Sequence, residues 1–146
     1  MMVLAILGVS LTASVMILSV SRIQDSKATE DTKVRLLVVA RGISGKFLKY
    51  RDPRREYETD VAALPSSLND LLVKPAAVTA CTVNNSEKKL EGWCGPYIDV
   101  KFQGETSFVD GWGNALILDS AGRSVRSMGP DGVDNSGGGD DLVQTF

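Results

Sequence analysis

An acidic, glycine-rich segment near the end of the chain has the residue types best suited to binding a metal. Met128–Leu142 reads MGPDGVDNSGGGDDL, with five glycines and neither lysine nor arginine. Its carboxylates repel one another unless a cation lies among them, and Ca²⁺ prefers carboxylate oxygens with backbone carbonyls. The residues by themselves leave two interpretations open, a calcium site and a solvated acidic loop near the C-terminus. The candidate side chains are Asp131, Asp134, Asp140 and Asp141.

The two cysteines, Cys81 and Cys94, enclose the polar segment TVNNSEKKLEGW. A single pair at this spacing fits no zinc motif. We expect a disulfide if the domain lies in an oxidising compartment, with two free buried thiols as the alternative.

Composition argues against two other functional classes. The chain has no histidine, the commonest general base and metal ligand, so a membrane-anchored enzyme is the weakest hypothesis. The net charge of −2 gives no electrostatic reason to expect nucleic-acid binding.

Two helical stretches precede these segments. Met1–Ser21 has no charged residue and is long enough to cross a bilayer, with a cleaved signal peptide as the alternative. Asp25–Arg51 is predicted to continue it as an amphipathic helix, ended by Asp52-Pro53. The apolar residues of this second stretch recur at steps of four and three and so share one face. They are Leu36, Ala40, Ile43, Phe47 and Tyr50.

The remainder predicts a small antiparallel sheet after a short helix at Ser67–Val73 and a loop at residues 76–96. The expected strands are Tyr97–Phe102, Ala115–Leu118 and Ser124–Ser127. The predicted fold class is therefore α+β, a long N-terminal helix, half membrane-spanning and half amphipathic, packed on a small antiparallel sheet.

Three motifs resemble the major pseudopilin of type II secretion systems, within the type IV pilin-like superfamily. They are Gly95-Pro96-Tyr97-Ile98, Asp110-Gly111-Trp112-Gly113-Asn114 and Ser127-Met128-Gly129-Pro130-Asp131-Gly132, followed by Asp140-Asp141-Leu142. The resemblance implies a pilin-like structural subunit of a pseudopilus that serves protein secretion. The alternative is a minor pilin-like subunit of a type IV pilus or DNA-uptake filament, acting at the tip, in adhesion or in initiation.

The resemblance also implies a structural calcium ion. Asp131 matches the family's aspartate ligand, and Met128 matches a residue that provides a carbonyl. We expect Asp140 as the second side-chain ligand, with Asp134 and Asp141 as alternatives, and the carbonyl of Val133 nearby.

Assembly through the N-terminal helix is the further implication. The expected partners are copies of the chain, minor pseudopilins and the inner-membrane assembly platform, with a single pass through a bacterial inner membrane and a periplasmic domain. We expect residues 1–24 to be the membrane and filament-core helix. Residues 25–146 would be the globular domain, comprising helix 25–52, variable loop 53–96, and sheet with calcium loop 97–146. The expected filament-packing residues are Leu4, Ile6, Leu7, Leu11, Val15 and Leu18.

The chain departs from the family at several places. Gly111 stands where the family has proline. The family's Phe-Thr-Leu-Ile-Glu start is not present before Met1, so we expect a natural start further upstream, with a protein that no prepilin peptidase processes as the alternative.

Overall fold

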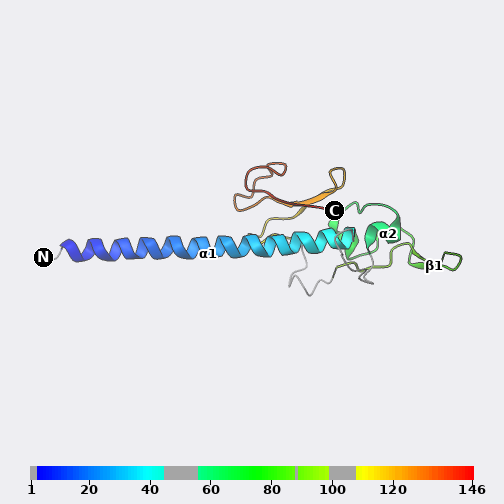
Figure 1. Cartoon of the computed structure of the whole chain (residues 1–146), viewed down its shortest axis with the longest axis horizontal. Coiled ribbons are helices and arrows are strands. Elements are labelled where there is room, and N and C mark those ends of the chain that lie inside the picture. The colour runs from blue at the N-terminus through cyan, green and yellow to red at the C-terminus, as the bar shows by residue number, and fades with distance from the viewer. Residues whose placement is uncertain (1–2, 45–55, 88, 99–107) are drawn as a thin grey trace.

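A long helix dominates the computed structural model, which describes residues 3–44, 56–87, 89–98 and 108–146, with side chains from residue 22 onward. This helix, α1, spans Val3–Ile43 and has 41 residues, a length of about 60 Å at 1.5 Å per residue. The other elements gather around its C-terminal part, and its N-terminal half projects beyond them (Figure 1).

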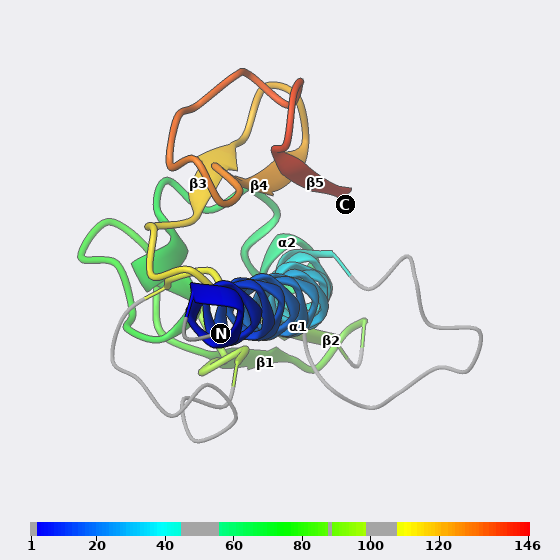
Figure 2. The same ribbon diagram turned by 90° about the vertical axis from the view of Figure 1, so that its left-hand side faces the viewer.

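The remaining elements are short and form two separate sheets. A two-stranded sheet pairs β1 with β2, and a three-stranded sheet has the order β3-β4-β5, all antiparallel. Viewed along α1, the two sheets lie on opposite sides of the helix (Figure 2). The elements are α2 Tyr57–Val61, the 3₁₀ helix η2 Leu68–Leu71, β1 Thr82–Asn84, β2 Lys89–Glu91, β3 Ile117–Asp119, β4 Ser124–Ser127 and β5 Leu142–Thr145.

One face of α1 forms the centre of the hydrophobic core. Leu36, Ala40 and Ile43, which recur at helical spacing, are all buried, and α1 contacts both β4 and β5. Val125 of β4 and the C-terminal Phe146 are buried in the same core cluster. The packing therefore holds the C-terminal half of α1 firmly against the larger sheet.

The predicted element boundaries are wrong in several places. The helix ends at Ile43, not at Arg51, and Phe47 and Tyr50 lie outside the described residues. Tyr97 and Ile98 are not in a strand, and residues 99–102 are not described. The Tyr97 hydroxyl instead accepts a hydrogen bond from the Cys94 amide, and Ile98 is buried in the core.

The predicted single sheet is also wrong, because two small sheets are present. The first is the β1–β2 hairpin, within the segment expected to be a loop. The second includes β5, which follows the acidic segment and was not expected to be a strand. Pairing across the acidic segment places β5 in the sheet: Arg126 of β4 lies opposite Val143 of β5.

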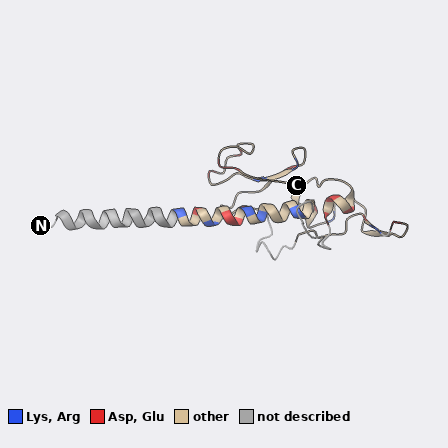
Figure 3. Ribbon diagram, viewed as in Figure 1, with Lys and Arg blue, Asp and Glu red and all other residues tan. Residues whose placement is uncertain are grey.

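No helix among the residues whose side chains are described is long and apolar enough to cross a membrane. Charges of both signs recur along the described part of α1 from Arg22 onward (Figure 3), which breaks any apolar stretch there. This finding overturns the membrane-spanning helix in the predicted fold class and the predicted single-pass inner-membrane location. The side chains of residues 1–21 lie outside the described part of the chain.

Candidate functional site

The buried carboxylate of Asp110 organises the segment that resembles the pseudopilin motif. Asp110 is 2% exposed. Its Oδ1 accepts hydrogen bonds from the amides of Trp112 at 2.9 Å and Asn114 at 2.8 Å, and its Oδ2 accepts one from the Ser127 hydroxyl at 2.6 Å. A buried carboxylate needs such donors, and here they join the turn at residues 110–114 to strand β4.

The same turn is fastened to α1. The amide of Gly111 donates to the Thr32 hydroxyl at 2.8 Å, and that hydroxyl donates to the Ala28 carbonyl at 2.7 Å. Arg35 donates from Nη1 to the Val109 carbonyl at 2.8 Å. A Cβ at residue 111 would lie 2.3 Å from the Ala28 oxygen, so only glycine fits this close approach. Proline, which the family has here, would also lack the donating N–H.

Asn114 connects this turn to the acidic segment, which we call the acidic loop and define as residues 128–141. Its side-chain amide donates to the Gly129 carbonyl at 2.9 Å. Gly129 has a φ of +64°, and a Cβ there would lie 2.4 Å from the Asp140 carbonyl oxygen. The glycine thus lets the two ends of the acidic loop pass close to each other.

Two of the predicted calcium ligands lie side by side in the acidic loop. Oδ2 of Asp140 accepts a hydrogen bond from the Asp131 amide at 3.2 Å. Oδ1 of Asp131 accepts one from the Val133 amide at 2.8 Å. The two main candidates are therefore neighbours, while Met128 is half-buried at the end of β4.

The two alternative ligands have other partners. Both oxygens of Asp134 accept hydrogen bonds from the Arg126 guanidinium, each at 3.0 Å. This contact, and then the amide of Ser136, lower the pKa of the Asp134 carboxyl below its usual 3.8. Oδ2 of Asp141 accepts from the amides of Asn135 at 3.0 Å and Gly137 at 2.8 Å.

The described residues contain no group of three or more histidine, cysteine, aspartate or glutamate side chains placed to hold a metal. Asp131 and Asp140 supply two carboxylates, short of the oxygen-rich shell that Ca²⁺ takes. Calcium binding at this pair stays a prediction. Arg126 was not anticipated as a residue of the site; the only signal for it was a basic residue two positions before a segment that has none.

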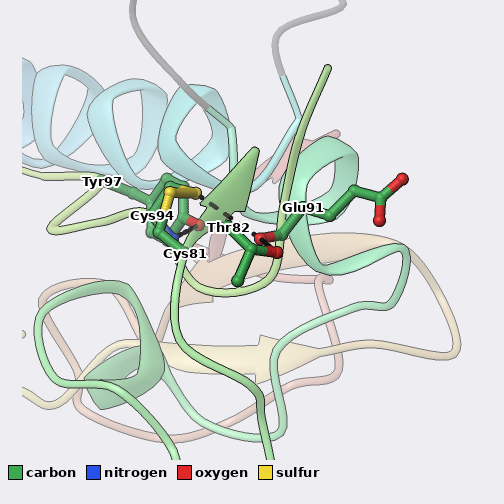
Figure 4. The surroundings of a disulfide bond; sticks show 5 residues. All are labelled: Cys81, Thr82, Glu91, Cys94 and Tyr97. Carbon is green, nitrogen blue, oxygen red and sulfur yellow. Dashed lines mark hydrogen bonds between the residues drawn. A yellow bond between two sulfur atoms is a disulfide. The ribbon is translucent and has the colours of Figure 1, made fainter. Parts of the chain in front are cut away.

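The cysteine pair forms a second notable feature. Cys81 and Cys94 are joined by a disulfide with a Cα–Cα distance of 4.6 Å, at the base of the β1–β2 hairpin (Figure 4). The Tyr97 hydroxyl accepts a hydrogen bond from the Cys94 amide at 2.8 Å, and the Tyr97 ring packs edge-on against Trp93. Burial raises the pKa of Tyr97 to about 12, so the hydroxyl stays protonated at neutral pH.

The predicted filament-packing residues all fall in the N-terminal half of α1, where only the backbone is described, so their side-chain contacts lie outside the described structure. They are Leu4, Ile6, Leu7, Leu11, Val15 and Leu18. Comparison of the chain with models of known families, with curated proteins and with solved structures gives no match.

Proposed function

We propose that the protein is a structural subunit of a pilin-like filament that serves protein secretion, assembled from copies of itself through α1. The observation that carries this proposal is the projection of α1 beyond its own domain (Figure 1). Residues 22–27 are exposed, and the described contacts between α1 and the turn at residues 110–114 begin at Ala28. About 37 Å of helix backbone therefore extends past this contact.

A projecting helix of this length needs a partner to be stable. An isolated helix is only marginally stable in water, and helices in proteins gain most of their stability from packing and not from intrinsic propensity. Ile23 is 69% exposed on the projecting part, an apolar side chain without cover from its own domain. Equivalent helices of neighbouring copies are the partner that the pseudopilin resemblance implies.

The disulfide supports a role outside reducing compartments, since such bonds persist mainly in oxidising environments. It also favours the second candidate function, a minor subunit at a filament tip. The closed β1–β2 hairpin lies at the end of the molecule opposite the N-terminus (Figure 1), where a tip subunit would present it to a surface. Immunogold labelling separates the two candidates, because a main subunit labels the whole filament and a tip subunit only its end.

A matched pair of substitutions tests assembly through α1. In cells that produce filaments, Ile23→Asp should reduce the sedimenting filament fraction at least about tenfold, which corresponds to ~1.4 kcal/mol. The physical reason is the cost of burying an unpaired carboxylate between helices.

The control is Val73→Asp, which places the same charge on a similarly exposed apolar residue just after η2. It should leave assembly near the wild-type level. Wild-type assembly by Ile23→Asp, or a wild-type protein that never enters filaments seen by electron microscopy, would contradict the proposal.

A further inference from the structure

Arg126 lies among the carboxylates that the acidic loop brings together. It belongs to β4, the central strand of its sheet, so the strands on both sides hold its backbone in place. Its side chain is only 16% exposed, and its guanidinium forms two parallel hydrogen bonds to Asp134. A second carboxylate, that of Asp119 on β3, lies 3.5 Å from Nη1.

Backbone amides of the acidic loop also donate to its carboxylates, whereas Oδ1 of Asp141 is buried with no hydrogen-bond partner among the described residues. Each of the loop's four aspartates accepts at least one amide hydrogen bond from within the loop. Amides that point at a carboxylate and a bidentate guanidinium are the strong donors that usually stabilise such charge in proteins. A divalent cation within reach of Asp134 would meet the positive charge of Arg126, which already occupies both oxygens.

We propose that Arg126 supplies the positive charge that closes the acidic loop, so that the loop keeps its shape without a divalent metal. In this arrangement one side chain held by the sheet neutralises carboxylates of the loop, the role that the pseudopilin resemblance assigns to a calcium ion. This role of Arg126 lies within the fold of one chain and does not depend on assembly into a filament.

Hydrogen exchange of the loop amides in the full-length protein tests the proposal. The readout is the exchange rate at residues 133–137, measured by mass spectrometry or NMR in excess CaCl₂ and in chelator. The wild-type rates should be equal in the two conditions. Arg126→Gln should speed exchange there by about two- to fivefold, the factor that the loss of a partly exposed ion pair represents, and leave the β1–β2 hairpin unchanged.

Two further variants complete the design. Arg22→Gln removes the same charge from an exposed position on α1 and should leave the loop rates as in wild type. Asp134→Asn breaks the pair from its exposed side and should open the loop like Arg126→Gln, which covers the case in which the strand variant fails to fold. Slower wild-type exchange in calcium than in chelator, or unchanged loop exchange in Asp134→Asn, would overturn the proposal.

Discussion

Single residues explain how the long helix and the acidic loop are joined. Asp110 accepts hydrogen bonds from amides of its own turn and from the Ser127 hydroxyl. Asn114 of the same turn donates a hydrogen bond to the Gly129 carbonyl of the acidic loop. Gly111 meets the Thr32 hydroxyl of α1 from the other side. The departure from the pseudopilin motif at residue 111 therefore has a physical reason. This close contact requires a residue that has no side chain and that can donate its backbone N–H.

The first prediction tests that contact. Gly111→Ala should lower the free energy of unfolding by about 1–3 kcal/mol, because its Cβ would collide with the backbone of α1. Chemical denaturation monitored by circular dichroism measures the change. Gly138→Ala is the matched control: the nearest atom to its added Cβ lies 3.3 Å away, in an exposed turn, so stability should change by less than about 0.5 kcal/mol. Equal stability of wild type and Gly111→Ala would show that the helix can move away at little cost.

The second prediction concerns the ionisation of Asp134. Because its pKa is lowered in the folded protein, the carboxylate stabilises the fold above its unfolded pKa, and this contribution is lost as pH falls through the lowered value. NMR titration of the side-chain carboxyl carbon should give a midpoint below 3.8 in wild type. Arg126→Gln should raise the midpoint towards 3.8, since the guanidinium is the largest cause of the shift. A wild-type midpoint at or above 3.8 would show that the ion pair does not form in solution.

At the scale of elements, the two sheets are stabilised by different means. The β3-β4-β5 sheet packs on the buried face of α1 and contributes Val125 to the core. The β1–β2 hairpin has largely exposed strands and is closed by the Cys81–Cys94 bond instead. A two-stranded hairpin alone is marginal in water, so the hairpin depends on its cross-link more than the larger sheet does.

The third prediction follows from this difference. Replacing both cysteines by serine, or reducing the bond, should speed amide exchange in β1 and β2 while β4 keeps its protection. In the chain-entropy account, a bridge that spans 13 residues stabilises the fold by about 3 kcal/mol. Exchange with and without reductant measures the local effect, and the serine variant with reductant controls for effects of the reductant itself. Equal loosening of both sheets would mean that the hairpin is part of the core folding unit.

At the scale of the whole molecule, the domain and the projecting helix are separable. The residues that α1 contributes to the hydrophobic core lie between Leu36 and Ile43. Nearer the N-terminus, α1 contacts the turn at residues 110–114 as far as Ala28. The part of α1 before residue 22 is therefore not needed to build the core of the described domain. Its role in the proposed function is assembly.

The fourth prediction tests this separation. A chain that begins at residue 22 should remain folded, with the thermal melt of the domain preserved, but should be monomeric and fail to enter filaments. Size-exclusion chromatography with light scattering and circular dichroism measures both properties. A full-length chain carrying only Ala13→Asp is the companion variant, which should fold equally well and assemble poorly because of one charge in the apolar stretch. Filaments formed by the shortened chain would show that residues after position 21 are sufficient for assembly.

Local chemistry along the chain was enough to predict some of these features. The recurrence of Leu36, Ala40 and Ile43 at helical spacing predicted the buried face of α1, because side chains three and four positions apart share a face. With only two cysteines, one intramolecular pairing was available, and the structure contains it. The strand at Ser124–Ser127 and its preceding turn also agree with the local pattern, since short alternating segments and turn residues carry their own preferences.

Only the tertiary structure decided the rest. The strand β5 depends on pairing with β4 across the whole acidic loop, which no local pattern encodes. The acidic loop shows this most clearly. Its composition left a bound cation and a solvated loop both open, and nothing in its own residues could reveal that β4 brings the Arg126 guanidinium within 3.0 Å of Asp134. The fold determines which partner a charged side chain has, because the electrostatic interaction depends on the distance between two groups in space and not on their separation along the chain.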